Sequence, residues 1–277
     1  MENNAIQHLL SEIQSQKLSL TEKETLKFAL SCIDLTSLEG SDTSEKITAL
    51  CEKAISIPTA AVCVYPVFVK QAKALLDETF IQTATVAGAF PAGQIPIELK
   101  IKEVAYAIEQ GAQEIDMVIS RGKFLEGQYD EVASEIAAIK KICGPNILLK
   151  VILETGELKD LELIFKASEL AMDAGADFIK TSTGKIPVNA TPESFATMCI
   201  AIKKFHQKTG KQIGIKPAGG ISDVETTLFF VKILENILGT EWMTPRLFRI
   251  GASRLADVLL NELSENKNGE NLPKTDY

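Results

Sequence analysis

The chain has little of what metal-dependent and disulfide-bonded proteins are built from. Its 277 residues include only two histidines, His8 and His206, and both fall in predicted helices away from strand ends. No H-E-x-x-H motif is present, and the five cysteines show no C-x-x-C spacing. The sequence therefore predicts neither a histidine-based metal site nor a serine–histidine catalytic pair. An odd, unpatterned set of cysteines is typical of reduced thiols in a cytoplasmic protein.

Long apolar runs and basic runs are also missing. No apolar stretch reaches the roughly 18 residues that span a membrane, and residues 1–4 lack the basic character of a targeting segment. Lysine and arginine number 29 against 37 acidic residues, which gives a formal net charge of −8. We therefore expect a cytoplasmic protein whose partners are neither nucleic acid nor membrane. An anionic ligand would need positive charge concentrated in a pocket.

What is present is a regular alternation of short apolar strands and amphipathic helices. Residues 5–30 resemble two helices, and the pattern then predicts strands at 32–36, 60–64, 81–87, 114–119, 147–153, 178–181, 214–216 and 248–251. The predicted helices cover 43–55, 66–77, 97–110, 127–142, 158–174, 192–208, 222–237 and 254–263. Thr21–Glu24 and Ser222–Glu225 have the form of capping boxes, and Gly111 and Gly175 stand where helices should end.

Eight strand–helix units in a chain of this length predict an α/β fold, a (β/α)8 TIM barrel with extra N-terminal helices and a polar C-terminal tail. We expect one domain over 1–277, with the barrel at 30–263 and a mobile tail at 264–277. The alternative is an open doubly wound sheet. Its first strand should be followed by a G-x-G-x-x-G turn, which Asp34-Leu35-Thr36-Ser37 does not resemble.

Charged residues stand at the predicted strand ends, where barrels carry their chemistry. The positions are Asp34 and Thr36, Cys63, Asp116, Lys150, Lys180, Lys216, and the stretch Gly251-Ala252-Ser253-Arg254. A single lysine at a strand end is usually a salt-bridge partner, and Cys63 fits a small buried residue. Three lysines on consecutive strands, preceded by an aspartate, are hard to explain by packing. They indicate an amine nucleophile.

The effect of one lysine on another can be sized. Two ammonium groups about 5 Å apart repel by roughly 3 kcal/mol at an effective dielectric of about 20, which corresponds to about two pKa units. An amine whose pKa falls by that much is neutral about a hundred times more often at pH 7. Only the neutral amine attacks a carbonyl. Asp116 can balance charge or relay protons, and the residues alone do not rank Lys180 above Lys216.

Two glycine turns indicate a phosphate site. Gly219-Gly220-Ile221-Ser222 and Gly251-Ala252-Ser253 follow the last two predicted strands and lead into helices. Backbone N–H groups and helix dipoles there favour an anion, and barrels frequently bind phosphate after these strands. The plainer interpretation of each glycine pair is a tight turn.

Five motifs together resemble the deoxyribose-phosphate aldolase family. They are Ile33-Asp34-Leu35-Thr36, Glu114-Ile115-Asp116, the stretch from Leu149 to Gly156, the stretch from Gly175 to Gly184, and Lys216-Pro217-Ala218-Gly219-Gly220. The resemblance extends from about residue 30 to residue 262. The segment lengths and the terminal Tyr277 of this chain are similar to those of the longer, enterobacterial-type members of the family.

The resemblance implies a metal-free, cofactor-free class I aldolase of deoxyribonucleoside breakdown. Such an enzyme reversibly cleaves 2-deoxy-D-ribose 5-phosphate to acetaldehyde and D-glyceraldehyde 3-phosphate. It also implies roles by position: Lys180 forms the Schiff base, Lys216 lowers its pKa, Asp116 moves protons with the help of Lys150, and Tyr277 is a further proton relay. Asp34, Thr36, Thr183 and Lys185 would bind substrate, and Gly219, Gly220, Gly251 and Ser253 would hold the phosphate.

One position departs from the family pattern. A second serine is usual after the Gly-Ala-Ser turn, and here it is Arg254. Its guanidinium either grips the phosphate or points to solvent. Barrels of this kind often pair, so a homodimer is the expectation. The alternatives left open are another lysine-dependent barrel, such as a transaldolase or a pyridoxal-phosphate enzyme, and a phosphosugar-binding barrel without catalysis.

Overall fold

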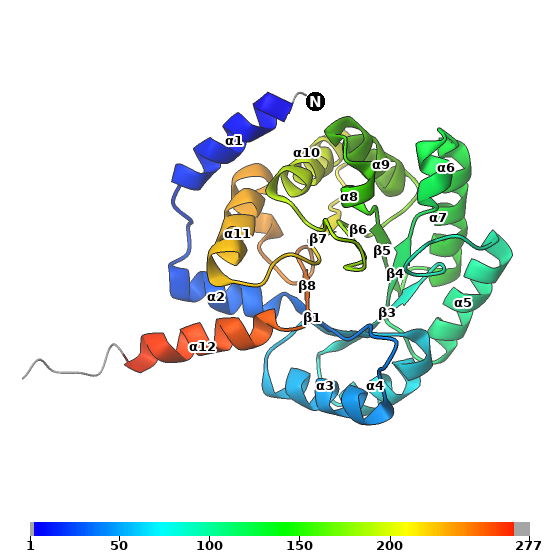
Figure 1. The fold of residues 1–277 in the computed structure, drawn as a ribbon, viewed down its shortest axis with the longest axis horizontal. Coiled ribbons are helices and arrows are strands. Elements are labelled where there is room, and N and C mark those ends of the chain that lie inside the picture. The colour runs from blue at the N-terminus through cyan, green and yellow to red at the C-terminus, as the bar shows by residue number, and fades with distance from the viewer. Residues whose placement is uncertain (1–2, 269–277) are drawn as a thin grey trace, which may run out of the picture.

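The computed structural model describes residues 3–268 and shows eight parallel strands in a ring surrounded by helices (Figure 1). The strands are β1 (Ile33–Thr36), β2 (Ala61–Val64), β3 (Gln82–Ala87), β4 (Glu114–Val118), β5 (Leu148–Ile152), β6 (Phe178–Lys180), β7 (Gly214–Lys216) and β8 (Ile250–Ala252). The TIM-barrel prediction is confirmed. Tyr277 lies outside the described residues.

The sheet runs in the order β7-β6-β5-β4-β3-β2-β1-β8, and every pairing is parallel. Short contacts close the ring between β7 and the segment that enters β8. Ile215 bridges Phe248, and Ala218 bridges Gly251. The Gly251 N–H also donates to the Pro217 carbonyl at 2.9 Å. A closed ring of this kind excludes the open doubly wound sheet.

Helices cover the outside of the ring. They are α1 (Asn3–Ser15), α2 (Glu22–Ser31), α3 (Ser44–Ser56), α4 (Val69–Leu76), α5 (Ile97–Glu109), α6 (Arg121–Leu125), α7 (Tyr129–Cys143), α8 (Thr155–Leu158), α9 (Leu161–Asp173), α10 (Pro192–Thr209), α11 (Val224–Leu238) and α12 (Leu255–Asn268). Helix α1 lies against α10 and α11, and α12 extends away from the ring (Figure 1). The two extra N-terminal helices are as predicted, and none of the helices within residues 3–268 is long and apolar enough to cross a membrane.

Several predicted boundaries are wrong in detail. The helix predicted at 66–77 divides into a 3-10 turn at Pro66–Phe68 and α4. The helices predicted at 127–142 and 158–174 correspond to α7 and α9, which are preceded by the one-turn helices α6 and α8. Helix α12 continues to Asn268, so the first five residues of the expected tail are helical. The cap of α11 is Asp223 and not Ser222, because the Asp223 carboxylate accepts hydrogen bonds from the Thr226 backbone and hydroxyl. The Thr21 capping box forms as predicted.

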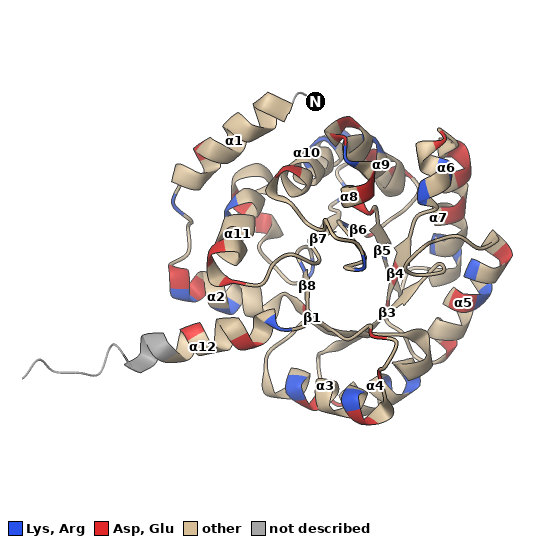
Figure 2. Ribbon diagram, in the orientation of Figure 1, with Lys and Arg blue, Asp and Glu red and all other residues tan. Residues whose placement is uncertain are grey.

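Alternate residues of each strand face the inside of the ring, since side chains change face at every step along a strand. The outward residues, such as Val62, Ile115 and Ile215, belong to the large apolar core beneath the helices. On β2 and β3 the inward residues form a separate cluster of small side chains that includes Ala61, Cys63 and Ala84. Much of the surface charge lies on the outer helices, as on α3, α4 and α5 (Figure 2). The small side chains leave room inside the ring for longer ones from the opposite strands.

Candidate active site

Strands β4 to β7 fill the interior with charged side chains. The same alternation points Asp116 of β4, Lys150 of β5, Lys180 of β6 and Lys216 of β7 inward. Asp116 pairs in register with Lys150, and Lys180 pairs with Lys216. All four side chains are buried, and only Lys180 keeps measurable exposure, at 3%. Four of the five predicted catalytic residues therefore lie together.

The Asp116 carboxylate is at the centre of this group. Its Oδ2 accepts hydrogen bonds from Lys180 Nζ and Lys216 Nζ, each at 2.8 Å. Its Oδ1 accepts one from Lys150 Nζ at 2.8 Å. Because the Lys180 and Lys216 nitrogens share one oxygen, they cannot be farther apart than twice that distance. The close approach assumed from the sequence is therefore present.

Asp34 of β1 belongs to the same buried group of charges. Its carboxylate is fully buried and accepts from Lys216 Nζ through Oδ2, with Lys150 Nζ 3.4 Å from the same oxygen. Asp34 does not line the cavity described below. The structure places Asp34 within the ion cluster, whereas the family resemblance implies substrate binding.

Two further buried charges were missed. Arg249, just before β8, donates to Asp34 Oδ1 at 2.7 Å and to Glu114 Oε1 at 2.8 Å. Glu114 also accepts from Lys150 Nζ at 2.5 Å. A pattern in the sequence could have revealed both residues. Glu114 and Asp116 are two apart on one strand and so share its inner face, and Arg249 falls inside a predicted apolar strand.

Burial and the facing charges set the ionisation of these groups. Desolvation is the largest cause that lowers the pKa of Lys180; Asp116 opposes it, and Lys216 lowers the pKa further. The repulsion expected from the sequence is therefore only part of the cause. For Lys216, burial is outweighed by Asp116 and Asp34, so its pKa is raised. The pKa of Lys150 is likewise raised, because Asp116 and Glu114 outweigh its burial.

The carboxylates respond in the opposite sense. Burial alone would raise the pKa of Asp116, but the three lysines hold it well below its usual range. Burial raises the pKa of the neighbouring Cys63 thiol to about 11. Near neutral pH, Cys63 is therefore an uncharged neighbour of the cluster. It fits the small buried residue expected from the sequence.

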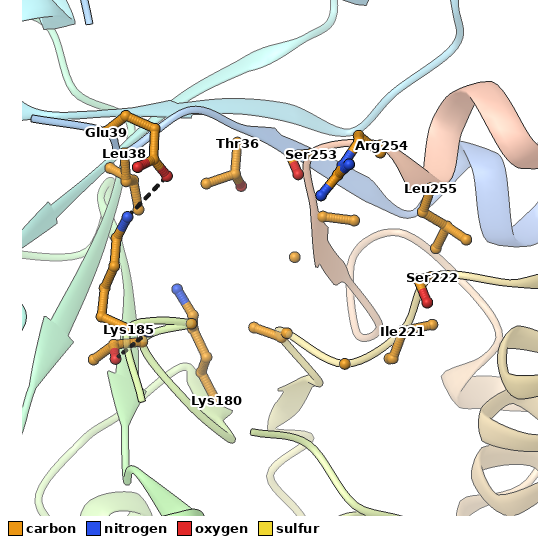
Figure 3. A pocket seen from close by; sticks show the side chains of 17 residues that line it. Thr36, Leu38, Glu39, Lys180, Lys185, Ile221, Ser222, Ser253, Arg254 and Leu255 are labelled. Atoms are coloured by element: carbon orange, nitrogen blue, oxygen red, sulfur yellow. Dashed lines mark hydrogen bonds and ion pairs between the residues drawn. The ribbon is translucent and has the colours of Figure 1, made fainter. Parts of the chain in front are cut away.

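A cavity of about 250 Å³ opens above Lys180. Figure 3 shows the Lys180 amine pointing into it, with Thr36 and the Ser253–Arg254 turn on the far side. Residues from the ends of β1, β6, β7 and β8 line it: Thr36, Leu38, Glu39, Lys180, Thr183, Gly184, Lys185, Ala218, Gly219, Gly220, Ile221, Ser222, Gly251, Ala252, Ser253, Arg254 and Leu255. Lys216 and Lys150 are absent from this wall. Of the three clustered lysines, Lys180 alone faces the cavity.

The predicted phosphate turns form one side of the cavity. Gly219 and Gly220 both have positive φ, at 72° and 81°, which other residues adopt only with strain. Gly251 has no room for a side chain, since a Cβ there would lie 2.9 Å from Ala218 Cβ and 3.1 Å from Lys216 Cε. The exposed Ser253 and Arg254 lie at the cavity rim. The N-terminus of α11 attracts an anion less than the sequence predicts, because the Asp223 carboxylate already caps its first turn.

The loop after β6 covers the opposite side. Lys185 Nζ donates to Glu39 Oε1 at 2.9 Å, which joins this loop to the one after β1 (Figure 3). Thr183 is fixed in this loop by Glu154, because its hydroxyl and its backbone N–H both donate hydrogen bonds to the Glu154 carboxylate. The fully buried Glu154 also accepts from Arg121 Nη1 at 2.8 Å. Glu154 and Arg121 were not predicted, although Glu154 stands within a quoted motif.

The predicted residues therefore separate into two layers. Thr36, Thr183, Lys185 and the glycine turns line the cavity, and the charged cluster lies beneath with Lys180 at the boundary. Within the described part of the chain, no three His, Cys, Asp or Glu side chains are grouped in a way that could hold a metal ion. The arrangement can present a buried amine to a small molecule and hold an anion at the glycine turns.

Comparison with known proteins gives one consistent family. Residues 28–236 match the model of the DeoC/LacD family aldolases. A deoxyribose-phosphate aldolase of Agrobacterium fabrum is 46% identical over 246 residues, covering 87% of this chain and 93% of that protein. The human deoxyribose-phosphate aldolase is 44% identical over 259 residues, covering 87% and 81%.

A solved structure agrees with the sequence matches. The deoxyribose phosphate aldolase of Aeropyrum pernix, described as a unique tetramer, superposes with a TM-score of 0.70 at 25% identity and covers 96% of this chain and all of that one. The family model spans most of the barrel, including the strands that carry the buried lysines. The chain belongs to the DeoC/LacD family of aldolases.

Proposed function

We propose that this protein is a class I deoxyribose-phosphate aldolase that cleaves 2-deoxy-D-ribose 5-phosphate reversibly through a Schiff base on Lys180. One observation carries the proposal. Among the buried lysines of the barrel interior, Lys180 alone faces the cavity, and its pKa is lowered while those of Lys150 and Lys216 are raised. A lysine of that kind can be neutral enough to attack an aldehyde near neutral pH.

The chemistry begins with attack of neutral Lys180 Nζ on C1 of the open-chain sugar. The resulting carbinolamine loses water and becomes a protonated imine. Acetaldehyde contains C1 and C2, so the bond that breaks is C2–C3: its electron pair moves toward the iminium nitrogen, and the C3 hydroxyl gives up its proton. D-Glyceraldehyde 3-phosphate leaves, the enamine is protonated at C2, and hydrolysis releases acetaldehyde and the amine.

Every step moves a proton, and the cluster provides groups for that transfer. Asp116 Oδ2 lies 2.8 Å from Lys180 Nζ, within direct hydrogen-bond reach of the reacting nitrogen. Lys216 Nζ bonds to the same oxygen, and Lys150 Nζ bonds to the other. We assign Asp116 and Lys216 to proton transfer around the carbinolamine, with Lys150 as a relay. Tyr277 keeps its proposed part as a further relay from the chain end.

The phosphate is placed at the opposite end of the cavity. Gly219, Gly220, Gly251 and Ser253 present backbone and hydroxyl groups there, with Arg254 at the rim. Thr36, Thr183 and Lys185 would contact the sugar between phosphate and amine. We place Asp34 in this scheme as a buried partner of Lys216.

The proposal is tested by reducing the protein with borohydride in the presence of acetaldehyde and mapping the modified peptide. We expect two carbons added at Lys180 and a Lys180→Met variant that neither reacts nor cleaves the phosphosugar. An adduct on Lys216 would reverse the two lysine roles. Phosphosugar binding without any adduct would favour a binding barrel, and visible absorbance of the purified protein would favour a pyridoxal-phosphate enzyme.

We further propose a cytoplasmic location and a homodimer. All five cysteines are free and buried, which suits a reducing compartment. Cell fractionation tests the location. Light scattering behind size exclusion tests the assembly, and a mass of one or four chains would contradict the dimer.

A further inference from the structure

The charged groups inside the barrel do not balance. The four cations Lys150, Lys180, Lys216 and Arg249 face the three carboxylates Asp34, Glu114 and Asp116. All seven residues are at most 4% exposed. Because an unmatched buried charge is costly, this interior is most stable when one cation gives up its proton.

Arg249 and Glu114 form the floor of the cluster, away from the cavity. The guanidinium joins Asp34 on β1 to Glu114 on β4, two strands that are not neighbours in the sheet. Its Nε donates to the Pro245 carbonyl, and its Cζ lies 5.9 Å from the centre of the Phe178 ring. An arginine held from so many sides is a fixed charge.

Glu114 and Arg249 also determine which carboxylates the buried lysines bond to. Glu114 accepts from Lys150, and Arg249 shares Asp34 with Lys216. Lys150 and Lys216 thus each bond to Asp116 and to a second carboxylate, whereas within residues 3–268 Lys180 bonds to Asp116 alone. Lys180 is therefore the surplus cation.

We propose that Glu114 and Arg249 are positioning residues that fix the charge balance of the barrel interior so that Lys180 is the lysine that loses its proton. This inference rests on the proposed function of Lys180. The lowered pKa of Lys180, set against the raised pKa values of Lys150 and Lys216, agrees with it. The Cys63 thiol, which also faces the cluster, stays neutral because burial raises its pKa to about 11.

The two residues should act with opposite signs. Removing the negative charge with Glu114→Gln favours deprotonation of Lys180, and removing the positive charge with Arg249→Met opposes it. The contacts through Lys150 and Asp116 place Glu114 within roughly 10 Å of the Lys180 amine, so a shift of about one pH unit is expected at an effective dielectric of about 20.

The experiment measures kcat/KM for 2-deoxyribose 5-phosphate from pH 5 to 10, with the pH dependence of borohydride trapping by acetaldehyde as a second readout. We expect the acid limb of the pH profile, where kcat/KM rises as Lys180 loses its proton, to move to lower pH in Glu114→Gln and to higher pH in Arg249→Met. In the double variant it should return towards the native position. Arg249→Lys retains the charge and should keep the native limb even where folding is weakened.

Glu135→Gln is the matched control. Glu135 is a buried carboxylate that pairs with Lys100 at 2.8 Å on the outer helices, away from the barrel interior. Its loss should lower stability and leave the limb unmoved. Limbs that stay native in both Glu114→Gln and Arg249→Met, or that move in the same direction, would overturn the inference.

If Arg249→Met does not fold, the comparison of Glu114→Gln with Arg249→Lys tests the inference. The acid limb of Glu114→Gln must then lie about one pH unit below the native limb, and the acid limb of Arg249→Lys must stay at the native position. Trapping of acetaldehyde on native Lys180 tests the proposed function separately. A native adduct with unmoved variant limbs would therefore reject this inference alone.

Discussion

Replacing Lys216 with methionine tests the electrostatic argument most directly. The change removes an ammonium group and keeps most of the length of the side chain. Lys216 Nζ and Lys180 Nζ each lie 2.8 Å from Asp116 Oδ2, so the lost repulsion acts over about 5 Å. At an effective dielectric of about 20 that repulsion is roughly 3 kcal/mol, equivalent to about two pH units.

The sign follows from the contacts. Without Lys216, Asp116 has one fewer cation to share, so its pull on the Lys180 proton increases while the repulsion disappears. Both changes raise the pKa of Lys180 and reduce its neutral fraction at pH 7. We expect kcat/KM at pH 7 to fall about a hundredfold and to recover partly as the pH rises by about two units.

The assay follows glyceraldehyde 3-phosphate release from pH 5 to 10, with circular dichroism to confirm folding. Lys185→Met is the control, because Lys185 pairs with Glu39 at the cavity mouth and lies outside the buried cluster. Its loss should leave the acid limb in place. An unshifted limb in Lys216→Met, with activity equally low at every pH, would refute pKa control and leave Lys216 as a proton-transfer group only.

Three further substitutions probe packing and binding. Gly214→Ala should lower the melting temperature by about 10 °C, because the added Cβ would lie 2.3 Å from the Phe178 ring; the activity of the folded fraction should change little. Glu154→Gln should cost about 3 kcal/mol in urea unfolding and raise KM, because Thr183 loses its charged acceptor. Arg254→Ala should raise KM for the phosphosugar several-fold and leave KM for unphosphorylated 2-deoxyribose unchanged. Equal effects on both sugars would place the Arg254 guanidinium away from phosphate.

Much of the architecture was predictable because strand alternation and strand-end chemistry are local patterns. The eight strands and the inward Asp116, Lys150, Lys180 and Lys216 follow from two-residue periodicity. The short turns before α7 and α9 were missed, because an isolated turn of four or five residues has too little periodicity to stand out. The longer α12 was missed because polar composition does not by itself end a helix.

The depth of a residue in the barrel was not predictable. The resemblance implies that Asp34 binds substrate, yet its carboxylate bonds to Arg249 and Lys216 in the buried cluster. Arg249 enters this group through the closure between β7 and β8, a contact between segments more than thirty residues apart. Such long-range pairing depends on strand register, which the sequence leaves open.

The choice between Lys180 and Lys216 shows what register contributes. The two lysines end neighbouring strands, pair with each other across the sheet, and share one carboxylate oxygen, so sequence position alone treats them alike. Their difference comes from β1: Asp34 reaches Lys216 and not Lys180, which gives Lys216 a second carboxylate and a reason to stay protonated. Lys180 reaches the cavity, and in the described part of the chain Asp116 is its sole carboxylate partner. The chemical asymmetry between two like residues thus arises from β1, whose Asp34 lies 182 positions before Lys216 in the chain.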